Sequence, residues 1–237
     1  MILEKIYEST KLANEEIASF LSKSTQSHYL YHSKGFGGDL SSESDILCEQ
    51  ILCKHLLRFA DIFSEESGYI ESNQKSKIKN SKFIIDPLDG SDNYLTNMPY
   101  YGSSVSFEID GEAKFSMVYN YVQNSFVAKI ENDLMISKTF SNRKIAIFER
   151  AYSNPKMCQK LFENNIKYRS PGAVALSLAN ARFLQFLLFA GNIREFDIKA
   201  GLHINSDLKI FQNNSFLLVC ENEAIFDQIK NLILELH

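Results

Sequence analysis

The sequence predicts a mixed fold, in which two helices pack on a largely antiparallel sheet and an α/β layer follows. Apolar residues recur at spacings of three, four and seven in two early segments, which is the pattern of amphipathic helices. They then alternate with polar residues in several short runs, which indicates antiparallel strands. In the second half, strand-like and helix-like segments take turns along the chain, which is typical of an α/β layer.

The N-terminal segment forms the first expected helix, because its apolar residues share one face. These residues are Leu3, Ile6, Ala13, Ile17, Phe20 and Leu21. Residues 22–44 are polar and contain Gly35, Gly37 and Gly38, so we expect a mobile loop or an irregular hairpin there. A second helix opens at Ser44 or Asp45, either of which could be its N-cap.

The first half continues with strands. Two alternating runs, 105–109 and 113–119, are joined by Asp110-Gly111, which is a strong hairpin signal. Two further strands are expected over 124–130 and 134–138, around a tight turn at Asn132-Asp133. These runs give the largely antiparallel sheet.

The second half alternates between the two kinds of element. Strands are expected at 144–148, 166–169, 183–189 and 216–220, and helices at 155–163, 173–181, from Asp197 onward and at 224–236. The longest apolar tract, 173–190, is interrupted by Asn180, Arg182 and Gln185. It therefore suits a core helix that runs into a core strand better than a membrane span.

Composition narrows the class of protein. The chain has 237 residues, of which 45% are hydrophobic and 23% charged, as in an ordinary soluble protein of one large or two small domains. The formal net charge of -4 argues against general affinity for nucleic acid or anionic membranes. The four cysteines show neither C-x-x-C spacing nor the density of a disulfide scaffold, and the N-terminus lacks a leader pattern. We therefore expect a cytoplasmic protein with reduced thiols.

One acidic stretch, 83–94, stands out. The apolar run Phe83–Ile85 is followed by Asp86, Asp89 and Asp92, with a proline and a glycine between them, so a strand is expected to stop at a polar bend. Carboxylates this close repel one another unless a cation lies among them, and a hard divalent ion is the natural candidate. Taken alone, such a stretch is more often an acidic turn that faces water. The ligand spacing of an EF-hand is absent.

Further acids stand at expected element ends or in loops, namely Asp45, Glu65, Glu66 and Asp197. Strand C-termini and helix N-termini are where open α/β structures gather ligands. One Glu, two or three Asp and a backbone carbonyl would suit Mg2+, which prefers oxygen ligands. The histidines lack the spacing of a zinc motif, so they offer no rival site.

The residues from Asp86 to Tyr94, D-P-L-D-G-S-D-N-Y, resemble the signature D-P-[IL]-D-G-[TS]-x-N-[FY] of the inositol monophosphatase superfamily of lithium-sensitive phosphatases. Three more segments resemble family motifs in the family's order: 40–45 is similar to V-T-x-x-D, 64–67 to G-E-E-S and 196–201 to W-D-x-A-A-G. The resemblance spans about residues 1–205. It implies the family's layered αβαβα sandwich as a single domain over 1–237, with an α+β part over about 1–140 and an α/β part over 141–237.

The resemblance also implies two or three Mg2+ ions. Glu65, Asp86 and the Leu88 carbonyl would hold one ion, while Asp86, Asp89 and Asp197 would hold a second. Such a cluster activates a water molecule and neutralises charge on both the attacking and the leaving oxygen.

Other residues receive supporting roles from the same resemblance. Ser91 would hydrogen-bond the attacking water, assisted by Asp45 and Glu65, and Glu66 would be a supporting acid. The phosphate oxygens would be received by the backbone N–H groups of Gly90, Ser91 and Asp92.

Three positions depart from the family pattern. Ala173 stands where the G-S-A-A motif has serine, Phe196 replaces tryptophan, and Ala190 stands seven residues before Asp197, where inositol-specific members place a sugar-binding glutamate. The nucleotidase branch tends to have Lys-Glu where this chain has Asp92-Asn93, and the fructose-1,6-bisphosphatase branch shares D-P-L-D-G-S. Three cations, Arg169, Arg194 and Lys199, are candidates for contacting a second phosphate, although a surface charge or a structural partner is the more common role for such residues.

The expected function is therefore Mg2+-dependent hydrolysis of a small phosphate monoester, such as inositol monophosphate or a similar sugar phosphate. The alternatives are a 3'(2'),5'-bisphosphate nucleotidase acting on 3'-phosphoadenosine 5'-phosphate, or a non-catalytic metal-binding member of the fold. A small phosphate ester and a second copy of the chain are the expected partners; neither nucleic acid nor a membrane is.

Overall fold

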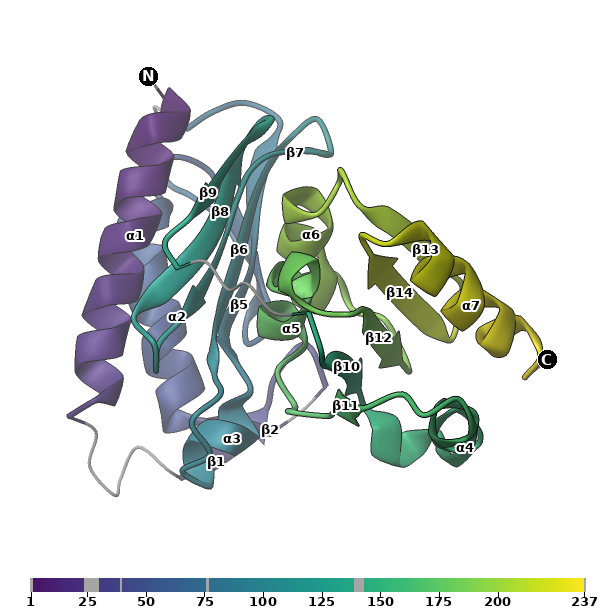
Figure 1. Cartoon of the computed structure of the whole chain (residues 1–237). Coiled ribbons are helices and arrows are strands. Elements are labelled where there is room, and N and C mark those ends of the chain that lie inside the picture. Colours follow the sequence, from purple (N-terminus) through teal and green to yellow (C-terminus); the bar gives the residue numbers. More distant parts are fainter. Residues whose placement is uncertain (1, 24–29, 39, 76, 139–142, 237) are drawn as a thin grey trace.

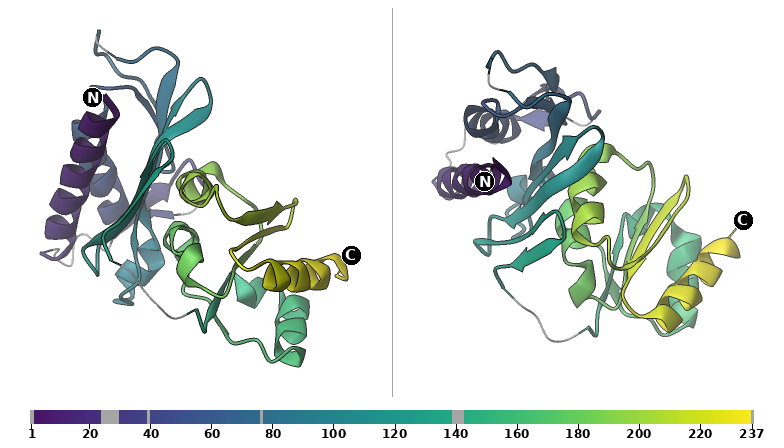
Figure 2. Two further views of the ribbon diagram at one scale, coloured as in Figure 1. Left: turned by 45° about the horizontal axis from the view of Figure 1, so that its top comes forward. Right: turned by 90° about the horizontal axis from the view of Figure 1, so that it is seen from above.

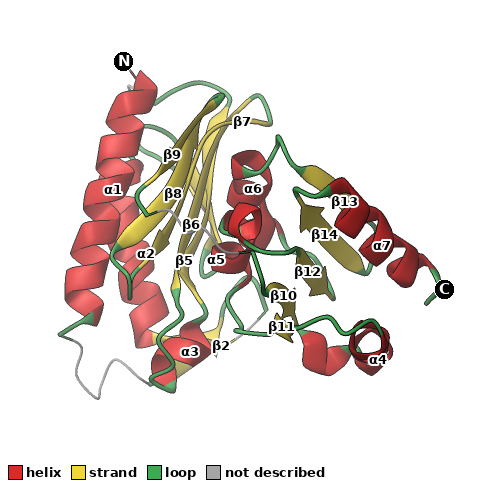
Figure 3. Ribbon diagram, viewed as in Figure 1, coloured by secondary structure: helices red, strands yellow, loops and turns green. Residues whose placement is uncertain are grey.

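Helices and sheets alternate in five layers in the computed structural model, which describes residues 2–23, 30–38, 40–75, 77–138 and 143–236 (Figure 1; Figure 3). The outer helices α1 (Ile2–Leu21) and α2 (Glu43–Leu56) cover a seven-stranded sheet. Its other face meets α5 (Val174–Ala179) and α6 (Glu195–Ile204). A five-stranded sheet follows, and α4 (Pro155–Glu163) and α7 (Glu223–Leu234) cover it. This arrangement confirms the predicted αβαβα sandwich.

The seven-stranded sheet has the strand order β4-β3-β5-β6-β7-β8-β9, and only β3 and β5 pair in parallel among these neighbours. The strands are β3 (Asp61–Ser64), β4 (Gly68–Ile70), β5 (Ser81–Asp89), β6 (Gly102–Ile109), β7 (Glu112–Asn120), β8 (Ser125–Ile130) and β9 (Asp133–Ile136). The expectation of a largely antiparallel sheet is confirmed. The short strands β3 and β4 were not predicted.

The turns of this sheet follow the backbone preferences of their residues. Asp110 and Gly111 join β6 to β7 with φ values of 52° and 84°, so both lie in the left-handed region that a tight two-residue hairpin needs. The turn between β8 and β9 lies at Glu131-Asn132, one residue earlier than predicted, because Asp133 already pairs with Ile130.

The five-stranded sheet is mixed, with the order β11-β10-β12-β14-β13. Its strands are β10 (Ala146–Glu149), β11 (Tyr168–Arg169), β12 (Leu187–Ala190), β13 (Lys209–Gln212) and β14 (Phe216–Cys220). β10 runs parallel to β11 and β12, and β14 runs antiparallel to β12 and β13. The tract 173–190 contains α5, a 3-10 turn (Ala181–Phe183) and β12, which confirms a core helix leading into a core strand.

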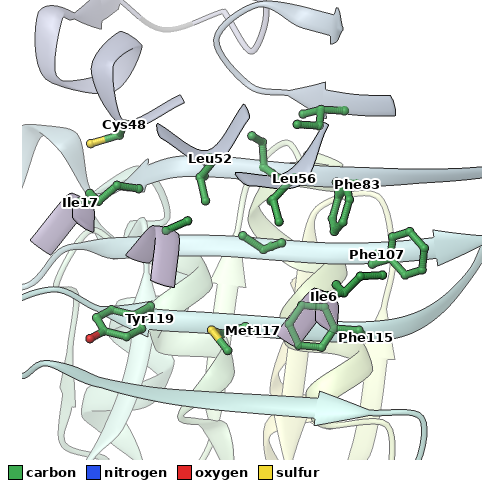
Figure 4. Close-up of a cluster of buried hydrophobic side chains, with 14 of the residues drawn as sticks. Ile6, Ile17, Cys48, Leu52, Leu56, Phe83, Phe107, Phe115, Met117 and Tyr119 are labelled. Atoms are coloured by element: carbon green, nitrogen blue, oxygen red, sulfur yellow. The ribbon is translucent and has the colours of Figure 1, made fainter. Parts of the chain in front are cut away.

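Apolar clusters fill the spaces between the layers. Figure 4 shows Leu56 of α2 close to Phe83 and Ile6 of α1 close to Phe107, in a cluster where all four side chains are fully buried. Each such side chain contributes about 1.5–3 kcal/mol through its removal from water. The α5–α6 layer lies between the two sheets in both views of Figure 2. It packs on one sheet through Leu176 and on the other through Leu178.

The start of α2 differs from the prediction. Its N-cap is Ser42, which accepts a hydrogen bond from the backbone N–H of Asp45, while the Asp45 carboxylate accepts one from the N–H of Ser42. This reciprocal capping box starts the helix two or three residues earlier than a cap at Ser44 or Asp45 would. Before it, β1 (Tyr31–Lys34) and β2 (Leu40–Ser42) form an irregular antiparallel hairpin, as expected; residues 24–29 and 39 lie outside the described part. Within the described residues, none of the helices is long and apolar enough to cross a bilayer.

Candidate functional site

All ten residues that the sequence placed in the site line one cavity of about 590 Å3. They are Asp45, Glu65, Glu66, Asp86, Leu88, Asp89, Gly90, Ser91, Asp92 and Asp197. The cavity lies where β2, the end of β5, the end of β10 and the short helix α3 (Ser91–Leu95) meet, near the lower edge of Figure 1. Residues far apart in the sequence therefore converge in one place.

Strand β5 carries two of the acids. The strand does not stop before Asp86, as the acidic bend had suggested, but continues to Asp89 with a register shift against β6 between the two. Pro87 lies in this irregular part and has no N–H to donate to the ladder, so regular pairing is interrupted there. Asp86 accepts a hydrogen bond from the N–H of Leu88 at 3.0 Å, and both aspartates are buried.

Three carboxylates, which we call the acid triad, could hold one metal ion. Glu65, Asp86 and Asp197 each contribute an oxygen, and these oxygens all lie within 4.8 Å of one another. Burial raises the pKa of Asp86 well above its usual range, and the charges of Glu65, Asp89 and Asp197 raise it further. Clustered oxygen ligands of this kind fit Mg2+, whose charge would offset the repulsion.

Asp89 lies outside the acid triad but faces the same cavity. Its Oδ2 accepts a hydrogen bond from the N–H of Leu176 at 2.8 Å, which ties the end of β5 to α5. Burial raises the pKa of Asp89, and the charges of Asp197 and Glu149 add to the rise. A second ion between Asp86, Asp89 and Asp197 stays a prediction.

Arg194, the residue before α6, bonds two members of the acid triad. Its Nη1 lies 2.6 Å from Glu65 Oε1, its Nε 2.9 Å from Asp197 Oδ2, and its Nη2 3.0 Å from Asp197 Oδ1. Of the two roles considered for this residue, the structure therefore shows structural pairing. Lys199 pairs with Glu108 at 2.7 Å, and Arg169 donates to the carbonyl of Tyr168.

Two further acids lie beside the triad. The Oδ2 of Asp45 is 2.6 Å from both the N and the Oγ of Ser42, so the capping box holds this carboxylate in place. Burial raises the pKa of Asp45. Burial also raises the pKa of Glu66 to about 8, although a hydrogen bond from the hydroxyl of Ser41 opposes the rise. Both groups therefore hold a proton more readily than an exposed carboxyl group does.

The N-terminus of α3 faces the cavity through Gly90, its N-cap. Gly90 has φ 81°, and a Cβ there would lie 2.9 Å from Ala173 Cβ and 3.0 Å from the carbonyl oxygen of Tyr100. Only glycine suits this close approach. Asn93 donates to the carbonyls of Tyr100 and Pro171, at 2.7 and 2.8 Å, so the helix is tied to the loop before α5.

Sequence reasoning missed three residues that line the cavity at the end of β10 and just after it. Glu149 is fully buried and accepts hydrogen bonds from the N–H of Gly172 at 2.9 Å and the hydroxyl of Ser177 at 2.5 Å. Arg150 has φ 56° and places its guanidinium 5.5 Å from the ring centroid of Phe189. Tyr152 is 83% exposed. The only signal in the sequence was their place at the C-terminal end of a strand.

The three residues that depart from the family pattern are all buried. Ala173 lies beside Gly90, and Ala190 is at the end of β12. Phe196 is buried beside Phe63, with ring centroids 4.8 Å apart, and meets Phe36 at 6.4 Å. Its ring therefore fills an aromatic cluster beside the cavity.

Comparisons with known proteins all point to the same protein family. A curated relative, "Nus factor SuhB" of Xylella fastidiosa, is 27% identical over 187 residues, which cover 69% of this chain and 65% of the relative. "Fructose-1,6-bisphosphatase/inositol-1-monophosphatase" of Methanocaldococcus jannaschii is 26% identical over 117 residues, which cover 49% of this chain and 44% of the relative. The matched parts thus span less than two thirds of either relative.

Solved structures share the whole fold. An inositol monophosphatase–fructose 1,6-bisphosphatase matches with a TM-score of 0.78 and 19% identity, over 95% of this chain and 98% of that chain. An IMPase/NADP phosphatase, whose structure contains Mg2+ and phosphate, matches with a TM-score of 0.72 and 19% identity, over 98% of this chain and 94% of that chain. The model of the inositol monophosphatase family matches residues 2–204. This chain, with its layered fold and its acid-lined cavity, belongs to the inositol monophosphatase family.

Proposed function

We propose that this protein is a Mg2+-dependent phosphomonoesterase that acts on a small phosphorylated metabolite. One observation carries the proposal: the acid triad, Asp89 and the N-terminus of α3 line the same cavity. Groups that could hold a metal and N–H groups that could receive phosphate oxygens would thus face the same bound substrate. The names of the phosphatase relatives support the same chemistry.

The acids of the cavity would hold the metal. Glu65, Asp86 and the Leu88 carbonyl would bind one ion, and Asp86, Asp89 and Asp197 a second. Bound Mg2+ supplies charge neutralisation at the phosphate and a nucleophilic water at neutral pH. The likeness to a structure that contains Mg2+ and phosphate supports this choice of ion.

The other residues of the chain would position the reactants. Asp45 is held by Ser42, so its remaining lone pairs can accept a proton from the attacking water, with Ser91 as a hydrogen-bond partner. The N–H groups at the start of α3 would point toward the phosphate, so Gly90, Ser91 and Asp92 would donate to its oxygens.

A 3'(2'),5'-bisphosphate nucleotidase is the second candidate, and two cavity residues favour it. Arg150 offers a positive charge for a second phosphate, and the exposed ring of Tyr152 offers a surface on which a base can stack. In addition, Ala190 offers no carboxylate for a sugar hydroxyl. A nucleoside bisphosphate would place its second phosphate near Arg150 and its base on the ring of Tyr152.

A non-catalytic role is the third candidate, because a matched relative carries the name Nus factor rather than that of a phosphatase. In such a protein the cavity would bind metal without turnover. A location in the cytoplasm, a homodimer and the absence of nucleic-acid binding remain predictions from the sequence.

A turnover screen separates the candidates. The purified protein with Mg2+ is given inositol monophosphate, 3'-phosphoadenosine 5'-phosphate or fructose 1,6-bisphosphate, and released phosphate is measured. Asp86→Asn and Asp89→Asn should abolish release, while Asp133→Asn, at the exposed start of β9, should leave it unchanged. Activity retained in the first two variants would overturn the site assignment. Metal binding without turnover of any ester would favour the non-catalytic role.

A further inference from the structure

We propose that Arg194 is an internal cation that competes with the divalent ion for the acid triad and thereby sets the metal affinity of the site. The inference rests on the proposed function, because it takes the acid triad to be a metal site. It assigns to Arg194 a role that the family motifs do not contain.

The contacts of Arg194 are those of a counter-ion. Its guanidinium makes a bidentate pair with both oxygens of Asp197 and reaches Oε1 of Glu65 at 2.6 Å. These carboxylates are buried, with side-chain exposures of 3% and 12%. A fork that bonds two carboxylates at once is the arrangement for which guanidinium is suited.

The same oxygen-bearing groups are the ones that a metal would use. Glu65 and Asp197 are two of the three members of the acid triad. A divalent ion among them would stand close to the guanidinium, and like charges repel strongly where water is excluded. A hydrogen bond to a ligand oxygen also occupies a lone pair that the metal would otherwise share. Binding of the ion therefore requires the guanidinium to move away from Glu65.

The position of Arg194 permits this movement. It is the residue before α6 and has an extended backbone, with φ -104° and ψ 146°, and its side chain makes no capping bond to the helix. The side chain lines the cavity and remains 19% exposed, so it has space toward solvent. Its contact with the carbonyl of Gly37, at 3.4 Å, is long. Because the side chain does not cap α6, a change of its rotamer leaves the helix in place.

Metal titration of matched variants tests the proposal. Mg2+ affinity is measured by isothermal titration calorimetry for the wild type, Arg194→Gln and Lys199→Gln. Lys199 is the control, because it lies on α6 near Arg194 in the sequence and pairs with a buried carboxylate, Glu108, outside the acid triad. We expect Arg194→Gln to bind Mg2+ about tenfold or more tightly than the wild type. The Lys199→Gln variant should bind it as the wild type does.

Thermal melts supply a second readout that a merely structural role would not produce. Without metal, Arg194→Gln should melt below the wild type, because Glu65 and Asp197 lose their counter-charge. At saturating Mg2+ this gap should close. Arg194→Lys keeps the charge but cannot form the bidentate pair, so its affinity should lie between those of the wild type and Arg194→Gln.

The outcomes are distinct. If the wild type binds Mg2+ and Arg194→Gln binds it equally or more weakly, the competition is overturned. The phosphatase proposal then stays intact. An equal loss of melting temperature with and without Mg2+ would show that Arg194 is only a structural partner and would also overturn it. A wild type and variants that bind no divalent ion would overturn both proposals.

Discussion

Raising the pH from about 5 to about 8 without divalent metal is expected to destabilise this protein, because the fold keeps the Glu66 carboxyl group protonated. Burial raises the pKa of this group from 4.5 to about 8, and the charges of Asp45 and Glu65 contribute. A group whose pKa is higher in the folded than in the unfolded state gives its full stabilisation at pH values below its unfolded-state pKa. That stabilisation is lost as the pH rises through the folded-state pKa. The window for Glu66 therefore runs from 4.5 to about 8.

The size of the effect follows from the pKa difference. One pKa unit corresponds to about 1.4 kcal/mol, so the difference between 4.5 and about 8 allows at most about 5 kcal/mol. Some water reaches the group and the structure can relax, so about 2–3 kcal/mol is a realistic loss. For a chain of this length 1 kcal/mol shifts the melting temperature by about 2–4 °C, which predicts a fall of about 5–10 °C.

The assay is a series of thermal melts in chelator across this pH range. Glu66→Gln mimics the protonated group, so its melting temperature should fall less than that of the wild type. Glu112→Gln is the control, because a hydrogen bond from Lys114 lowers the pKa of Glu112 at an exposed site, and its fall should match the wild type. A wild-type melting temperature that stays level or rises would refute the reasoning. So would a Glu66→Gln variant that loses stability as steeply as the wild type.

Substitutions at three positions test the packing around the cavity. Gly37→Ala would place a Cβ 2.6 Å from Cγ of Glu65, so this side chain should shift and Mg2+ affinity should fall about tenfold by calorimetry, with an unchanged circular dichroism spectrum. Gly90→Ala should lower the free energy of unfolding in urea by about 1–3 kcal/mol and abolish phosphate release, because its φ of 81° and its close contacts suit only glycine. Phe196→Ala should cost about 3–5 kcal/mol in the same assay, because its ring packs on Phe63, whereas Phe196→Trp should keep most of the stability.

The acids of the cavity could be found from the sequence because they follow elements with strong patterns. Asp86 and Asp89 end a long buried strand, and Asp197 lies in the first turn of a helix. The order of the motifs then suggested that these residues meet. The strand β3, in contrast, is only four residues long and almost wholly buried, so no alternation marks it. Glu149 carries no motif, and only the fold brings its strand to the cavity.

The contacts of Arg194 could be predicted only in part from the local sequence. Its spacing of three residues from Asp197, at the start of a helix, was a visible sign of pairing. Its contact with Glu65 depends on the approach of α6 to the turn after β3, which no local pattern encodes. The sequence therefore left Arg194 with two roles, and the structure decides between them by placing its charge between two carboxylates.

Protonation and Arg194 neutralise neighbouring acids of the same cavity, so the two effects must be coupled. The metal-free fold tolerates several carboxyl groups in one cavity because some hold protons, as the raised pKa values of Asp86 and Glu66 indicate, and because Arg194 pairs with others. Removing that cation should raise the pKa of the remaining groups further. In chelator, the melting temperature of the Arg194→Gln variant should therefore go on falling to a higher pH than that of the wild type. A fall that ends at the same pH in both proteins would mean that Arg194 and the protonated carboxyl groups act independently.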